Sequence, residues 1–193
     1  MKSFLSVLAG LTFLYAFFPY IRAIMCEETR PRKATWLIWM LGDVITVAGM
    51  LAKHTISGQL VAAIIGAGTV FLLSLKYGES GWTKRDKICI SIAVLAIVSW
   101  QYLGESNAGV ALGLFAIVVA AWPTYVSAWE KPENEDRKGW IIFEISSLLA
   151  VLAIPHWTFA NYAPPIVFLS IDTPMMYLLC IRPFFKRRAV QTE

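Results

Sequence analysis

Three acidic residues lie within long apolar stretches of the chain: Asp43, Glu144 and Asp172. An ionised carboxylate at mid-membrane costs about 2.5–3.5 kcal/mol on insertion scales, so it needs a partner or a water-filled cavity. We interpret Asp43 and Asp172 as residues that bind a cationic or zwitterionic solute or take up a proton, with Glu144 as a secondary candidate. The alternative is that Asp43 and Asp172 stay protonated and form hydrogen bonds between helices, and that Glu144 is shallow enough to reach the lipid headgroups or the basic connection after the fifth span.

The composition places these carboxyl groups in a membrane protein. Of the 193 residues, 58% are hydrophobic and 16% are charged, against about 45–50% and about 25% in soluble domains. The net charge of +4 is small, and the basic residues stand between apolar runs, which argues against nucleic-acid binding. No hydrolase, metalloprotease or nucleotide-binding pattern is present, and the three cysteines share no ligand spacing. We therefore predict no enzymatic activity, no cofactor and no metal site.

Seven apolar runs are candidate membrane spans. Their expected limits are 3–20, 34–52, 60–75, 88–103, 108–128, 139–154 and 164–181. Asp43 then lies about nine residues, or roughly 13 Å, into the second span, and Asp172 lies at a similar depth in the seventh. All but two of the 17 Lys and Arg residues fall on one side of the membrane, the exceptions being Lys2 and Lys53. Because cytoplasmic connections collect basic residues, we expect a multi-pass protein of the bacterial plasma (inner) membrane, with its amino terminus outside and its carboxyl terminus in the cytoplasm.

Two segments of the chain match at a constant offset of 104 residues. The matched pairs are Pro19 and Pro123, Trp36 and Trp140, and Thr69 and Thr173. One unmatched span separates the two copies, so both copies have the same orientation in the membrane. The expected fold is all-α, with two parallel three-helix repeats joined by a linker helix. The expected units are 1–76 for the first bundle, 77–107 for the linker, 108–182 for the second bundle and 183–193 for a basic cytosolic tail.

The plan, the orientation and a proline late in the first and fifth spans resemble the SWEET and PQ-loop superfamily. The segments Thr29-Arg30-Pro31 and Trp122-Pro123-Thr124 are also similar to a group of bacterial membrane proteins with this plan. The resemblance implies a carrier that moves a small solute across the bilayer, such as a sugar, an amino acid or an amine, by rocking two three-helix bundles. Proton coupling and homo-oligomerisation are left open, as is the alternative of a receptor or sorting protein that binds without transport.

The resemblance also implies where a central site lies. The solute-contacting positions of the third and seventh spans fall at Thr69 and at Asp172-Thr173. Trp39 and Trp122 are candidates for a gate or for stacking on a solute, against the alternative of ordinary packing. A proline inside a helix removes a hydrogen bond and crowds the preceding turn. Pro19, Pro123 and Pro174 are therefore candidate hinges, against the alternative of ordinary helix-end prolines.

Overall fold

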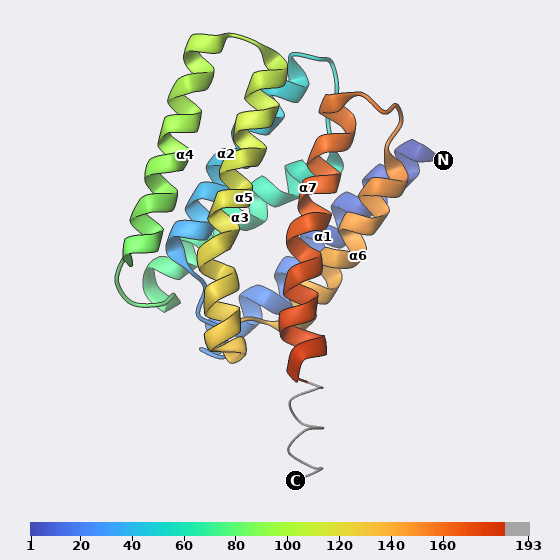
Figure 1. The fold of residues 1–193 in the computed structure, drawn as a ribbon. Helices are drawn as coiled ribbons and strands as arrows, with labels where there is room; N and C mark the ends of the chain where they lie inside the picture. Colours follow the sequence, from blue (N-terminus) through green and yellow to red (C-terminus); the bar gives the residue numbers. More distant parts are fainter. Residues whose placement is uncertain (184–193) are drawn as a thin grey trace.

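Apolar runs separated by proline, glycine and charged residues form α-helices in a computed structural model of the chain (Figure 1). The structure describes residues 1–183, without the side chains of residues 96, 97, 100 and 101. Within this part the chain forms seven α-helices and no strand. The helices are α1 (Lys2–Met25), α2 (Lys33–Leu51), α3 (Gly58–Tyr77), α4 (Lys84–Leu103), α5 (Ser106–Glu130), α6 (Arg137–Ala153) and α7 (Phe159–Met176). A 3₁₀ turn (Pro132–Asn134) precedes α6, and a π-helical turn (Tyr177–Ile181) extends α7.

Five of these helices are long and apolar enough to cross a membrane: α1, α2, α3, α5, and α7 with its π-helical extension. The other two have shorter apolar parts, because α4 begins with four charged residues and α6 has only 17 residues. The sequence predicts seven spans, whereas length and composition support five within the described residues. Several long apolar helices in one chain indicate a multi-pass integral membrane protein.

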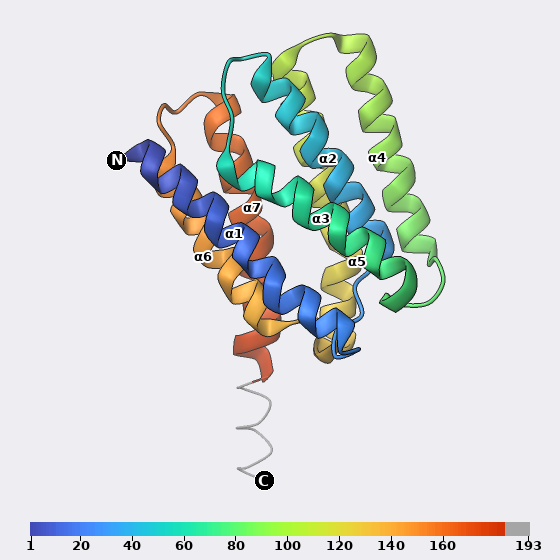
Figure 2. The same cartoon turned by 180° about the vertical axis from the view of Figure 1, so that it is seen from behind.

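The helices of each half pack in the same order. In the first half α3 lies between α1 and α2, and in the second half α7 lies between α5 and α6 (Figures 1 and 2). Across the two halves α1 packs on α6 and α2 packs on α5, while α4 packs on α5 and, less extensively, on α2. Exchanging α1, α2 and α3 for α5, α6 and α7 leaves the packing among these six helices unchanged, whereas α4 packs on one side only.

The connections 26–32, 78–83 and 131–136 lie at one end of the bundle, which we call the basic end (lower end of Figure 1). The amino terminus and the connections 52–57, 104–105 and 154–158 lie at the opposite end. The described basic residues at or near the basic end are Arg22, Arg30, Arg32, Lys33, Lys76, Lys84, Arg85, Lys87, Lys131, Arg137, Lys138 and Arg182. The expected basic tail, with Lys186, Arg187 and Arg188, lies outside the described residues except for its first residue. Positive charge is thus concentrated at one end, as expected from the sequence.

Helices α2 and α5 approach each other closely because glycines face each other where they cross. A methyl group added at Gly113 would collide with the hydroxyl of Thr46 and lie 2.8 Å from the carbonyl oxygen of Gly42. Thr35 adds a polar contact to the same pair of helices, since its hydroxyl donates a 2.9 Å hydrogen bond to the Ala120 carbonyl. The hydroxyl of Thr124 in turn donates to Thr35 at 3.0 Å. These contacts hold the two halves together along α2 and α5.

Replacing Gly113 with alanine should lower the melting temperature of the detergent-solubilised protein, because α2 and α5 must move apart to accept the methyl group. We expect the free energy of unfolding to fall by about 1–3 kcal/mol. Gly68→Ala is the matched control, since its methyl group would lie 3.3 Å from the flexible thioether of Met40. Equal melting temperatures for the two variants in scanning fluorimetry would contradict the close approach of these helices.

Candidate functional site: a central acidic and aromatic cavity

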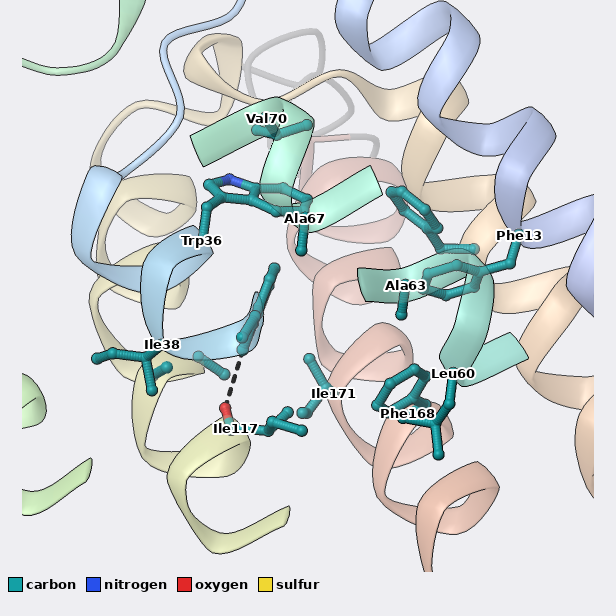
Figure 3. Close-up of a cluster of buried hydrophobic side chains, with 14 of the residues drawn as sticks. Phe13, Trp36, Ile38, Leu60, Ala63, Ala67, Val70, Ile117, Phe168 and Ile171 are labelled. Atoms are coloured by element: carbon teal, nitrogen blue, oxygen red, sulfur yellow. Dashed lines mark hydrogen bonds between the residues drawn. The ribbon is translucent and has the colours of Figure 1, made fainter. Parts of the chain in front are cut away.

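A small cavity lies in the interior of the bundle, bordered by α1, α2 and α3 from one half and by α5, α6 and α7 from the other. The volume open to the centre of a water molecule is about 40 Å³, enough for about three waters. Figure 3 shows part of the surrounding core, with Ala63 of α3, Ile117 of α5 and Phe168 of α7. We call this space the central cavity, and its lining residues are Phe13, Phe17, Trp36, Trp39, Asp43, Ala63, Ala67, Ile117, Trp140, Phe143, Phe168, Ile171 and Asp172.

Aromatic rings from both halves form much of the cavity wall. The rings of Trp36 and Trp39 are nearly perpendicular, with centroids 4.9 Å apart and an interplanar angle of 82°. The ring of Trp39 also lies beside that of Trp140 from the other half, with centroids 6.1 Å apart and an interplanar angle of 72°. The Trp39 indole N–H donates a 2.9 Å hydrogen bond to the carbonyl oxygen of Ile117, drawn as the dashed line in Figure 3. This bond fixes the plane of the ring and satisfies its one polar group.

Two carboxyl groups are the acidic part of the lining. Asp43 is 2% exposed, and its Oδ1 atom has no hydrogen-bond partner. Asp172 is 5% exposed, and its Oδ2 atom accepts a 2.5 Å hydrogen bond from the hydroxyl of Ser147. Within the described residues neither carboxyl forms a salt bridge, and no Lys, Arg or His lines the cavity. A buried carboxyl without a counter-charge is stabilised by a proton, water or a bound cation.

A chain of polar side chains leads from Asp172 toward the end of the bundle that carries the amino terminus. The amide of Gln59 on α3 donates to the Ser147 hydroxyl at 2.9 Å, and Ser147 donates to Asp172. The neighbouring Ser146 donates to the carbonyl oxygen of Ala9 on α1 at 2.8 Å. These three polar residues therefore join α1, α3, α6 and α7 just beyond the central cavity.

A second cavity of about 380 Å³ lies beyond these polar residues. Its walls include Ser6 and Ala9 of α1, Gly58 of α3, Ala153 of α6 and Pro165 of α7. Gly58 precedes Gln59, and Ala9 accepts the hydrogen bond of Ser146. A layer of hydrogen-bonded side chains thus connects the second cavity to the central cavity.

At the basic end, ionic and hydrogen bonds tie several segments together. Arg32, at the start of α2, forms a 2.8 Å salt bridge with Glu79 and a longer one of 3.7 Å with Asp86. Glu79 also accepts hydrogen bonds from Ser127 of α5 at 2.5 Å and from Asn134 at 3.0 Å. We call these five residues the Arg32 cluster; it holds the ends of α2, α4 and α5 against the connection that follows α3.

Glu135 forms a separate buried site at the same end. It is 5% exposed, and its Oε2 atom accepts hydrogen bonds from the Tyr20 hydroxyl at 2.7 Å and from the Trp140 indole N–H at 2.9 Å. Burial raises the pKa of the Glu135 carboxyl to about 7; the two hydrogen bonds oppose this rise, and the charges of Glu79 and Asp136 add to it. Trp140 also lines the central cavity, so the Glu135 site shares a residue with the cavity wall.

The structure brings together three of the residues that the sequence singles out. Asp43, Asp172 and Trp39 all line the central cavity. Thr69 does not: it is exposed on α3, and its hydroxyl donates to the carbonyl of its own helix at Ile65. Trp122 is 60% exposed and also lies outside the lining.

Thr173 and Glu144 form a pair outside the cavity lining. The hydroxyl of Thr173, on the exposed face of α7, donates to Glu144 at 3.0 Å. Glu144 is partly buried on α6 and does not line the central cavity. Glu144 therefore contacts a side chain of the neighbouring helix rather than the central cavity.

The three candidate hinge prolines lie inside helices rather than at their ends. Pro19 is followed by six further residues of α1, and Pro123 by seven further residues of α5. A proline leaves the carbonyl four residues earlier without its helical donor. For Pro123 that carbonyl belongs to Val119, and the Cys89 thiol donates to it at 3.4 Å. Next to Pro174, the carbonyl of Ile171 accepts a 3.0 Å hydrogen bond from Tyr125.

Several residues of the site were not singled out from the sequence. Phe13, Phe143 and Phe168 resemble the other apolar residues of their helices, and only the folded structure shows which ones face inward. Ser147 could have been predicted as a site residue from the sequence, because it lies 104 residues after Asp43 and therefore occupies the matching position of the expected repeat.

The fold and the cavity define the class of protein, a helical multi-pass membrane protein with a buried acidic and aromatic cavity. Comparison of the chain with protein-family models, with curated proteins and with solved structures gave no match. The function is therefore argued from the cavity and the helices around it.

Glu135→Gln should flatten the dependence of stability on pH between about pH 4.5 and pH 7. The pKa of Glu135 is about 7 in the folded protein against an ordinary value of 4.5. The folded state therefore holds the proton more tightly than the unfolded state, and stability falls as the pH rises through this window. Across this window we expect the Glu135 carboxyl to lower the free energy of unfolding of the wild-type protein by up to about 3 kcal/mol. The measurement is the melting temperature of each variant across this pH range.

Glu133→Gln is the control for this experiment, because Glu133 is an exposed carboxylate two residues away. It should keep the wild-type slope of melting temperature against pH. Glutamine at position 135 can still accept hydrogen bonds from Tyr20 and Trp140, so loss of these contacts does not explain a flatter slope. A wild-type slope in Glu135→Gln would contradict the assignment.

Proposed function

We propose that the chain is a small-solute membrane transporter, either a facilitator or a proton-coupled carrier. Its two groups of three helices would expose the central cavity alternately to the two sides of the membrane. The observation that carries the proposal is the buried cavity with Asp43 from one half and Asp172 from the other. Polar groups at membrane depth are costly, and they commonly mark solute or proton pathways.

The proposal includes a plan of two parallel three-helix repeats, α1–α3 and α5–α7, with α4 as the linker and all seven helices as membrane spans. Three observations support it. The packing order is the same in both halves. Exchanging α1–α3 with α5–α7 also converts the contact of α1 with α6 into that of α5 with α2. Successive helices also run alternately between the basic end and the opposite end (Figure 1). An odd linker helix gives both repeats the same orientation.

The proposal places the basic end in the cytoplasm of a bacterial cell and the amino terminus outside. The support is the concentration of basic residues at one end, because cytoplasmic connections collect them. In this orientation the Arg32 cluster and the Glu135 site lie on the cytoplasmic side, and the second cavity lies on the outer side.

The two ends of the bundle differ in a way that suits one conformation of a transport cycle. The Arg32 cluster binds the helix ends together at the basic end. At the other end, the hydrogen-bonded side chains of Gln59, Ser146 and Ser147 lie between α1, α3, α6 and α7, and no salt bridge ties the helix ends there within the described residues. Inward opening in the proposed cycle would require the Arg32–Glu79 salt bridge to break.

Asp172→Asn should abolish solute accumulation or exchange in proteoliposomes, because the isosteric amide cannot supply the negative charge of the cavity. The assay follows radiolabelled glucose, alanine and methylammonium with the purified full-length protein. Ser170→Ala is the control on the same helix, since Ser170 is exposed and bonds only to the Val167 carbonyl of α7. Full flux in Asp172→Asn would reject the proposed role of Asp172. Solute binding without flux in the wild-type protein would favour a receptor over a transporter.

If Asp43 or Asp172 exchanges a proton during the cycle, flux should depend on pH between about 5 and 8, and the Asp→Asn variants should flatten that dependence. The titratable groups beside Asp172 are Glu144 of α6 and Tyr125 of α5, and their Gln and Phe variants serve as comparisons. Asp43 forms no salt bridge within the described residues. Flux that is independent of pH in the wild-type protein would reject proton coupling and leave a facilitator.

A further inference from the structure

We infer that the central cavity binds a compact organic cation, one that carries an ammonium or methylated ammonium group, between its aromatic rings and the carboxylates of Asp43 and Asp172. The inference names the substrate class of the proposed transporter and rests on that proposal for the transport step. Binding itself depends only on the chemistry of the cavity wall.

The charge of the lining favours a cation. Its two ionisable groups, Asp43 and Asp172, are both acids and both more than nine-tenths buried. The Oδ1 atom of Asp43 has no hydrogen-bond partner, and this residue borders the cavity. An anion would meet two carboxyl groups there without a basic residue in the lining to offset them. A cation would instead supply the missing counter-charge.

The aromatic wall favours an organic cation over a hydrated metal ion. Ring faces attract an ammonium group within about 6 Å of the ring centroid, and enclosing rings recognise methylated ammonium ions. The planes of Trp36 and Trp39 meet at 82° and those of Trp39 and Trp140 at 72°, so neighbouring rings of the wall differ in orientation. Phe13 and Phe143 continue the wall with centroids 4.7 Å apart. Such rings supply few oxygen ligands for a metal ion.

The same lining disfavours the other two solute classes that the sequence resemblance implies. A sugar carries several hydroxyl groups that each need a partner, and beyond the two carboxyl groups and the unpartnered indole N–H of Trp36 the wall is apolar or aromatic. An amino acid brings a carboxylate, which would have no basic partner in the lining. The volume of about 40 Å³ also favours a small solute. Of sugar, amino acid and amine, the cavity fits the amine.

The test is a titration of the purified full-length protein in detergent with tetramethylammonium, methylammonium, tert-butanol and glycine betaine. Tert-butanol approximates the shape of tetramethylammonium without its charge, and glycine betaine adds a carboxylate to the methylated ammonium group. Trp36, Trp39 and Trp140 line the cavity, so intrinsic tryptophan fluorescence and the melting temperature both report binding. We expect at least one of the two cations to bind at least about tenfold more tightly than tert-butanol or glycine betaine.

Asp43→Asn and Asp172→Asn should each weaken cation binding by at least about tenfold, while the exposed Ser170→Ala should leave it unchanged. The selectivity of the wild-type protein keeps the inference testable if a variant does not fold. Equal binding of tert-butanol or glycine betaine, unchanged binding in both Asn variants, or no response to either cation would overturn it.

A flux assay in proteoliposomes with the same two cations, glucose and alanine distinguishes binding from transport. Cation binding without flux in proteoliposomes supports the inference and rejects the transporter. Flux of glucose or alanine without cation binding supports the transporter and rejects the inference.

Discussion

Every polar group that a helix carries into the membrane must find its partner inside the protein, because lipid offers none. The described structure meets this constraint through side chains that bond to neighbouring helices. The Trp39 indole donates a hydrogen bond to the Ile117 carbonyl. The Val119 carbonyl, which Pro123 leaves without its helical donor, accepts a hydrogen bond from the Cys89 thiol. Each of these bonds joins two different helices, so the contacts that satisfy polar groups also fix the helix arrangement.

Two polar groups of the central cavity wall do not meet this constraint within the described residues: the Trp36 indole N–H and the Asp43 carboxyl. The Oδ1 atom of Asp43 is buried and unpartnered beside the central cavity, whereas the Asp172 carboxyl is bonded to Ser147. Leaving a buried acceptor unpaired costs about 1–3 kcal/mol. In the proposed function, the solute or a proton would supply the missing partner of Asp43.

The sequence predicts the helices well, because each is an apolar run ended by charged residues, glycine or proline. It also predicts that Asp43 and Asp172 share a site, since both are acids at similar depth. It does not distinguish inward from outward faces in helices that are apolar all round. Thr69 and Thr173 match in the expected repeat, yet both are exposed, as related positions of two similar bundles would be. Glu135 gave no signal at all, because a glutamate in a charged connection resembles a solvated residue until folding buries it.

The two interfaces between the halves are not equal, although the same exchange of helices relates them. Along α2 and α5 the backbones approach at Gly42 and Gly113, and Thr35 and Thr124 add hydrogen bonds. The second cavity, by contrast, has part of its wall on α1 and α6, at Ala9 and elsewhere. In the proposed transport cycle the halves would separate along α1 and α6, where the second cavity already leaves space beside these helices. The resulting passage would lie off the centre of the bundle and be lined on two sides by helices from different halves.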